Sequence, residues 1–196
     1  MKAFKALLAV LAAASLAGCA SATTGPPAAG STAVTASQSP KASESSARQQ
    51  ILFDPCKSLP REVVMKAGYD PNNLEPSDFD GGSYKFLVCD LSSDMYSLGI
   101  SSGNISVTEQ QAQQKRDSPT KVVTPITVAG RSGFEARDPS RPNMCTLAFQ
   151  ASYGEVLLTR YQREKATDAG LDVCDGMQQT AVTIAAALPV GRRAPA

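Results

Sequence analysis

Five cysteines constrain this chain more than any other feature, because cysteines that pair decide which segments must lie together. They are Cys19, Cys56, Cys89, Cys145 and Cys174. Cys19 ends an apolar N-terminal segment, which leaves an even set of four for two disulfides. Four cysteines allow three pairings, and sequence alone does not choose among them. We expect the pairing in chain order, Cys56 with Cys89 and Cys145 with Cys174, with each bond closing a loop of about 30 residues.

A metal or redox site is the alternative use of these cysteines. The chain has no Cys-x-x-Cys pair and no histidine that could complete a zinc ligand set. Catalytic dithiols usually lie close together in sequence, and these cysteines do not. The missing histidine also removes the most common general base. We therefore expect no metal, no cofactor and no enzymatic activity.

The first 18 residues are organised like a signal peptide. Lys2 and Lys5 form a positive start, and residues 6–16 form an apolar stretch that is too short to span a bilayer. The stretch ends in Leu16-Ala17-Gly18-Cys19, which resembles a bacterial lipobox. This motif predicts that Cys19 carries a lipid and anchors the chain on the extracytoplasmic face of the cell membrane. An ordinary signal peptide is the alternative.

Residues 19–50 comprise this cysteine and a segment of Ser, Thr, Ala, Gly, Pro and Gln. Such a composition cannot bury enough apolar area to offset the entropy of ordering, so we expect a disordered tether. Its mean reach is roughly 30 Å by the random-coil estimate. The segment suits O-glycosylation as well as an unmodified spacer. We expect a folded domain over residues 51–189 and a disordered tail over 190–196.

Three helices are expected in the folded domain. The first is capped by Ser58 and stopped by Gly68. The second starts at a capping-box match, Thr108-Glu109-Gln110-Gln111, and is so polar that it must lie on the surface. The third is amphipathic and capped by Asp168 or Asp172. Its apolar stripe comprises Cys174, Met177, Ala181, Ile184 and Leu188.

Alternating apolar residues predict strands between these helices, after a loop over residues 69–82. The expected strands are 84–90, 95–100, 122–128, 132–137, 145–151 and 155–161. Residues 105–107 either lengthen the second of these strands or pair with it across a turn. Short turns at Ala129-Gly130 and Ser152-Tyr153-Gly154 force antiparallel neighbours, and Pro125 indicates an edge strand or a bulge. The fold class is therefore α+β: an antiparallel sheet of about five to six strands with the three helices packed on it.

Two catalytic motifs occur without their partners. Residues Gly99–Gly103 match the Gly-x-Ser-x-Gly nucleophile elbow, but that motif needs an immediate helix and a histidine. Residues Ser118–Lys121 match Ser-x-x-Lys, but the accompanying Ser-Asp-Asn and Lys-Thr-Gly motifs are missing. We interpret both as turn or loop sequences.

Two charged groups invite a ligand interpretation. Asp70, Glu75, Asp78 and Asp80 contain only a fragment of a calcium loop, and a solvated acidic segment is the alternative that we favour. Arg131, Arg137 and Arg141 could bind an anion such as a phosphate, although ordinary surface charge is the simpler interpretation.

The order of these motifs resembles a family of actinobacterial cell-envelope lipoproteins with a domain of unknown function. The resemblance rests on the lipobox, the Ser/Thr/Pro tether, the Phe53-Asp54-Pro55-Cys56 opening and the Val128-Ala129-Gly130-Arg131 turn, together with the four later cysteines. It covers residues 52–188. It implies an envelope location, two disulfides and a sheet similar to Mog1/PsbP-like folds, and it implies no catalytic residues.

Charge and motifs together favour a binding function. A formal net charge of +1 provides no electrostatic footprint for nucleic acid. The leading hypothesis is a monomeric, non-catalytic binding or scaffold module, anchored to the membrane by its lipid. Its partner would be an envelope lipid, a glycolipid or a protein. A carboxylate-dependent hydrolase or transferase and a purely structural or immunity-type envelope component are the alternatives.

Overall fold

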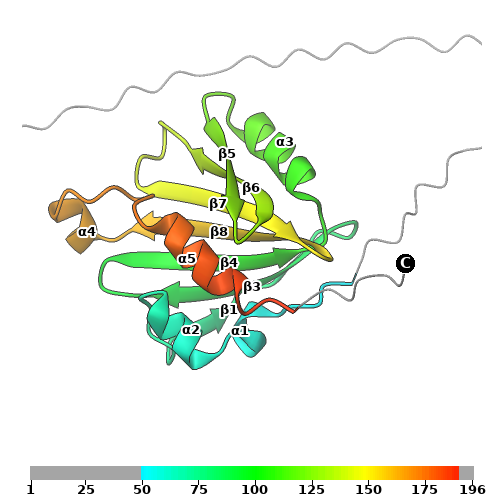
Figure 1. Cartoon of the computed structure of the whole chain (residues 1–196). Coiled ribbons are helices and arrows are strands. Elements are labelled where there is room, and N and C mark those ends of the chain that lie inside the picture. Colours follow the sequence, from blue (N-terminus) through cyan, green and yellow to red (C-terminus); the bar gives the residue numbers. More distant parts are fainter. Residues whose placement is uncertain (1–49, 190–196) are drawn as a thin grey trace, which may run out of the picture. The chain divides into compact units, whose positions relative to one another are not determined.

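The computed structural model describes residues 50–189, which fold around one antiparallel sheet (Figure 1). The predictions for the signal peptide, the lipidated Cys19, the tether and the tail fall on residues 1–49 and 190–196, which lie outside the described residues. Sheet and short helices together confirm the α+β fold class.

The strands are β1 (Leu74–Pro76), β2 (Phe79–Asp80), β3 (Lys85–Ser92), β4 (Tyr96–Gly103), β5 (Val122–Val128), β6 (Arg131–Arg137), β7 (Met144–Ala151) and β8 (Gly154–Gln162). The helices are α1 (Pro55–Ser58), α2 (Arg61–Lys66), α3 (Val107–Asp117), α4 (Glu164–Asp168) and α5 (Met177–Ala185).

The sheet has eight strands in the order β1-β3-β4-β8-β7-β6-β5, and β2 also pairs with β3. It exceeds the expected five to six strands because the segment expected to be a loop contributes β1 and β2. Strand β5 ends the order, so Pro125 lies on an edge as predicted. The β5–β6 turn places Ala129 and Gly130 at φ of 48° and 78°, which is the geometry that a two-residue hairpin requires.

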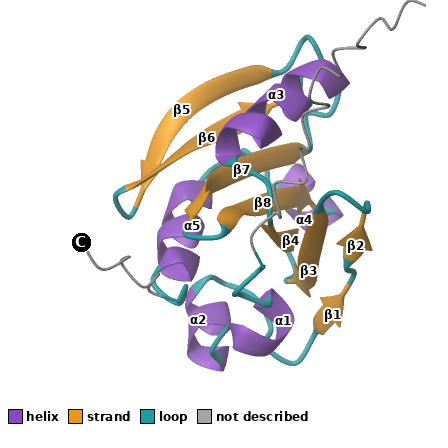
Figure 2. Cartoon of the chain, turned by 90° about the vertical axis from the view of Figure 1, so that its right-hand side faces the viewer, coloured by secondary structure: helices purple, strands orange, loops and turns teal. Residues whose placement is uncertain are grey.

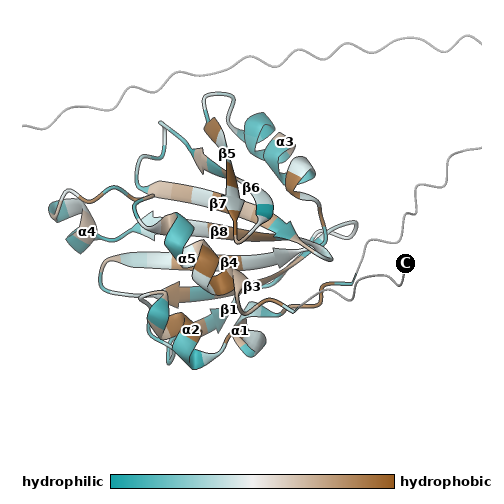
Figure 3. Ribbon diagram, viewed as in Figure 1, coloured by the Kyte–Doolittle hydropathy of each residue, from teal (hydrophilic) through white to brown (hydrophobic). Residues whose placement is uncertain are grey.

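The two faces of the sheet are covered differently. One face packs against α1, α2 and α5 and holds the main core, including Leu98, Leu147 and Leu158. The opposite face carries α3 over β6 and β7 (Figure 2), with a small cluster around Val107 and Phe134. Figure 3 shows that α3 is largely hydrophilic, whereas α5 has a strongly apolar segment. Within residues 50–189, no helix has the length and apolar content needed to cross a membrane.

The first expected helix is two helices. Asp54 caps α1 by accepting a hydrogen bond from the Lys57 backbone N–H at 3.2 Å, and α1 ends at Ser58, which is therefore not an N-cap. Pro60 occupies the N-cap of α2 without a side-chain hydrogen bond. Gly68 follows α2 at a φ of 89°, which fits its predicted role as a stop.

The other two helix starts were also predicted wrongly. Helix α3 is capped by Ser106, whose side chain accepts from the Glu109 backbone N–H at 3.1 Å, so the capping box begins two residues before Thr108. Residues 105–107 accordingly lead into α3 and extend no strand. Helix α5 is preceded by Gly176 as its N-cap, and Asp168 ends the separate helix α4. Asp172 instead accepts from the Cys174 backbone N–H at 2.7 Å.

Two disulfides connect the peripheral segments to the sheet. Cys56 of α1 is bonded to Cys89 of β3, and Cys145 of β7 is bonded to Cys174 just before α5. This is the pairing in chain order. The apolar stripe of the C-terminal helix is buried as expected, with Met177 and Ala181 fully enclosed.

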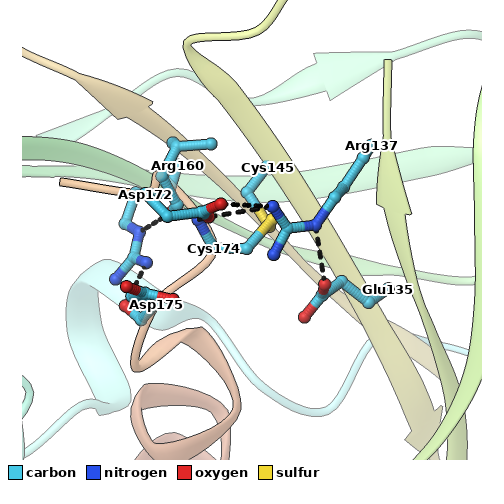
Figure 4. Close-up of a disulfide and its surroundings, with 8 residues drawn as sticks. Glu135, Arg137, Cys145, Arg160, Asp172, Cys174 and Asp175 are labelled. Atoms are coloured by element: carbon cyan, nitrogen blue, oxygen red, sulfur yellow. Dashed lines mark hydrogen bonds and ion pairs between the residues drawn. A yellow bond between two sulfur atoms is a disulfide. The ribbon is translucent and has the colours of Figure 1, made fainter. Parts of the chain in front are cut away.

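Arg160 reinforces the second disulfide. Its guanidinium donates hydrogen bonds to the carbonyls of Val173 and Asp175, on both sides of Cys174 (Figure 4). The same group lies 4.4 Å from the centre of the Tyr96 ring. A buried arginine with these partners is part of the structural core and is not available to a ligand.

Candidate functional site

A groove of about 610 Å³ lies between α3 and the face of the sheet opposite the main core. Its floor is formed by Val88, Ser101 and Leu157, which are register neighbours on β3, β4 and β8. The small Ser101 lies between two larger apolar side chains, so the floor is hollowed at its middle. Ile105, in the connection from β4 to α3, forms part of one end.

Helix α3 provides one wall of the groove. The residues that face it are Glu109, Gln110, Ala112, Gln113 and Arg116, which recur at three- and four-residue spacing. The Ser106 cap decides where the helix begins and therefore which residues face the sheet. The prediction of a surface helix is incomplete, because Gln110 is buried against the sheet.

Three aromatic rings form the opposite wall. Phe79, Tyr84 and Phe86 come from the β2–β3 hairpin, with ring centres 5.8 Å apart for the first pair and 6.0 Å for the second. Phe79 is 50% exposed and Tyr84 is 39% exposed, which is unusual for rings of this size. A Cβ at Gly103 would lie 2.4 Å from the Phe86 ring, so this glycine lets the ring lie flat on β4.

Glu155 is a buried carboxyl beside this groove. It is the second residue of β8 and stands on the same face as Leu157 of the floor. Its side chain is fully buried, and neither carboxylate oxygen has a hydrogen-bond partner. Burial, and secondarily the negative charge of Glu109, raises the pKa of Glu155 to about 9. Glu155 is therefore protonated at neutral pH.

The comparison with protein families gives one match. A family described as proteins of unknown function, DUF3558, matches residues 14–186. The chain belongs to the DUF3558 family. No curated protein and no solved structure matches this DUF3558 chain, so a Mog1/PsbP-like sheet stays a prediction. The family description states no activity, and the function must be argued from the groove itself.

Three of the four acidic residues of this DUF3558 chain that suggested a cation site are bonded to neighbouring groups. Asp70 accepts from the side chains of Asn72 and Asn73, Asp78 accepts from the Val88 backbone N–H, and Asp80 forms an ion pair with Lys85. Most of these residues are exposed. They support turns and the short strands β1 and β2, which agrees with the solvated alternative.

Among the described residues, one group of side chains is close enough to share a metal ion: Glu135, Cys145 and Cys174. Its two sulfur atoms are bonded to each other in a disulfide (Figure 4). They therefore lack the thiolate charge that a metal ligand requires.

The three arginines considered for an anion site are each bonded to a different protein group. Arg131 donates to the Gln150 carbonyl. Arg137 forms ion pairs with Asp172 at 2.7 Å and Glu135 at 3.2 Å, and Arg141 pairs with Asp138. These partners satisfy the guanidinium groups within the protein, as the surface-charge interpretation expects.

The catalytic motifs also have structural explanations. Gly99–Gly103 lies inside β4, so no strand-to-helix elbow forms at Ser101, although this serine lines the groove floor. Ser118 ends α3, and Lys121 is buried with its ammonium group bonded to the Gln114 side chain.

Glu155 and the groove were missed in the sequence. In the sequence, only the strand pattern Glu155-Val156-Leu157-Leu158 points to a buried acid. In a strand, Glu155 lies on the same face of the sheet as the apolar Leu157. That pattern predicts an outward-facing acid just as well, since one face of an antiparallel sheet is commonly solvated.

Proposed function

We propose that this chain is a non-catalytic binding module of the cell envelope that holds an amphipathic lipid in the groove between α3 and the sheet. The groove carries the proposal. Its volume falls within the range typical of small-molecule sites, roughly 300–1,000 Å³. An apolar floor and an aromatic wall suit a hydrocarbon chain, and the polar side chains of α3 suit a headgroup.

The exposed aromatic rings favour a lipid over a protein partner. Phe79 and Tyr84 keep much of their apolar surface in contact with solvent at the edge of the groove. The turn that connects β2 to β3 at this edge is held by a hydrogen bond from the Gly81 backbone N–H to the Tyr84 carbonyl, which presents both rings at the groove. Aromatic side chains with one polar end are also favoured where apolar and aqueous phases meet.

The location is part of the same proposal. The lipobox at Cys19 supports a lipid anchor on the extracytoplasmic face of an actinobacterial cell membrane, and the two disulfides agree with an oxidising compartment. We expect an alkyne-tagged fatty acid fed to the producing cells to label the chain. Cys19→Ser should abolish the labelling. Equal labelling of both proteins would contradict the anchor.

The groove is tested by filling it. Ala112 lies on the groove face of α3, and Ala112→Trp would place an indole in the cavity. We expect this variant to weaken binding of the uncharged dye Nile red to the full chain by tenfold or more, as measured by fluorescence titration. Thr108→Trp adds the same side chain at an exposed position of α3 outside the groove and should leave the affinity unchanged.

Two results would contradict the groove as the ligand site. One is the absence of saturable dye binding to the native chain. The other is equal weakening by Ala112→Trp and Thr108→Trp, which would indicate that the dye binds elsewhere or responds to a general loss of structure.

A carboxylate-dependent hydrolase is the second candidate, and one observation favours it. A carboxyl that stays protonated at neutral pH is what a general acid requires, and Glu155 is such a group beside the charged Glu109. A hydrolase of this kind needs two carboxyls that face each other in a cleft, whereas Glu109 is exposed. Hydrolysis of nitrophenyl glycosides or esters by the native chain, lost in Glu155→Gln, would favour this candidate over a binding module.

A further inference from the structure

Glu155 does not itself line the groove, but it lies two residues before the floor residue Leu157 on the same face of β8, toward the start of α3. Its register neighbours are Gly103 on β4 and Gln150 on β7, and the Phe86 ring covers Gly103. Glu109, in the first turn of α3, is close enough to act on it electrostatically. The carboxyl is fully buried, next to strand positions whose neighbours line the groove.

Nothing in the described structure holds the Glu155 carboxyl in place. Both of its oxygens are buried and neither takes part in a hydrogen bond. Buried polar atoms in folded proteins nearly always have partners, so an exception requires an explanation. Gln150, the nearest polar side chain in register, is committed elsewhere, since its amide donates to the carbonyls of Ala151 and Gly154. A ligand group is then the natural partner.

The surroundings of Glu155 suit a positive charge. Glu109 brings a second carboxyl to this end of the groove while one of its oxygens accepts from Ser106. Aromatic faces attract cations, and Phe86 lies against Gly103, the register neighbour of Glu155, and lines the groove together with Glu109. The only cationic side chain on the groove face of α3 is Arg116, seven residues and thus about 10 Å further along the helix axis.

We propose that this end of the groove binds the protonated amine of an amphipathic ligand, with Glu155 as the carboxylate that pairs with it and Glu109 and Phe86 beside it. The inference rests on the proposed function, because the ligand's apolar part would occupy the groove.

Amine binding must release a proton. In the free protein Glu155 is neutral at pH 7, and pairing with an ammonium group requires the carboxylate. The carboxyl proton passes to the buffer while the ligand keeps its own. Among the neighbours of Glu155 named above, Gly103, Gln150, Phe86 and Glu109, only Glu109 is an acid, and its negative charge contributes to the raised pKa of Glu155.

Calorimetry with n-octylammonium and n-octanol tests this inference on the full chain. The two probes share one tail and differ in charge. At pH 7, titrations in two buffers with different ionisation enthalpies should show close to one proton released per octylammonium bound and none per octanol. Ionising Glu155 at pH 7 offsets much of the gain from a charge-assisted hydrogen bond. We therefore expect the affinity for octylammonium to rise by about tenfold per pH unit between pH 6 and 8, and the affinity for octanol to stay constant.

Glu155→Gln separates the two proposals. We expect it to abolish both the proton release and the rise of octylammonium affinity with pH, while octanol binding persists. Glu75→Gln makes the same substitution at an exposed position on β1 and should behave like the native chain. Octanol binding together with octylammonium binding that releases no proton and does not change with pH would overturn the amine site alone. Failure of both probes to bind would overturn the groove proposal with it.

Discussion

At the scale of single residues, Glu155 makes the chain's stability depend on pH in an unusual direction. Its pKa is raised from 4.5 to about 9 on folding, so the folded state binds a proton that the unfolded state has lost. Stability is then fully present below pH 4.5 and declines as the pH rises toward 9. Asp138 acts in the opposite sense, because hydrogen bonds from Ser140 hold its pKa below the ordinary range, and this contribution is lost in acid.

We therefore predict that Glu155→Gln flattens the alkaline side of the stability profile. Between pH 4.5 and 7 the free energy of unfolding of the native chain should fall by about 3 kcal/mol relative to that of the variant. Urea unfolding at several pH values measures this difference. Glu75→Gln, which removes an exposed acid, should keep the native slope. Parallel profiles for all three proteins would mean that Glu155 is hydrated or paired.

At the scale of elements, the start of α3 controls the groove because it determines which side chains of the helix face the sheet. Ser106 and Glu109 form a reciprocal capping box, with Ser106 N–H donating to the Glu109 carboxylate at 2.8 Å. The sequence match at Thr108 has the same residue types two positions later. Both are plausible caps locally, and only tertiary packing of Val107 against Phe134 selects the earlier one.

Ser106→Ala should lower the free energy of unfolding by about 1 kcal/mol, because the Glu109 backbone N–H loses its acceptor. Thr108→Ala should change it by less than about 0.5 kcal/mol, since Thr108 is exposed. Chemical denaturation of the two variants checks this prediction. The reverse order of effects would show that α3 begins at Thr108.

The strands show which elements of the fold can be predicted from sequence patterns and which cannot. β5 to β8 were predicted within a residue or two, because each alternates over seven or more residues and is bounded by a short turn. β1 and β2 were missed because three and two residues contain no detectable period. They form only where β3 offers hydrogen-bonding partners, which local sequence does not reveal.

At the scale of the whole molecule, the cysteines were the most informative residues and the candidate site was the least predictable. An even set in an oxidising compartment implies two bonds, whichever partners are chosen. The groove instead depends on Phe86, Ser101 and Leu157, which are distant in sequence and meet only through strand register. Each of these side chains is of a type that is common in strands, so no local sequence pattern identifies these residues as part of a groove.

The two disulfides should stabilise the folded chain by similar amounts. The bonds join residues 33 and 29 positions apart, and closing loops of that length is worth about 3–4 kcal/mol in the chain-entropy model. We expect the double variants Cys56→Ala/Cys89→Ala and Cys145→Ala/Cys174→Ala each to lose about this much, as measured by urea unfolding. Losses below about 1 kcal/mol would contradict a structural role for these bonds.

The first disulfide also determines how the fold bears mechanical load. A pull along the chain from before Gln50 reaches α1 first, and a four-residue helix alone would unravel at negligible force. Cys56 instead transfers the load covalently to Cys89 in β3, which has strand neighbours on both sides. Tension then loads hydrogen bonds of the sheet interior together and does not peel the domain open from its end. In a reducing environment the same pull would unwind α1 and α2 first.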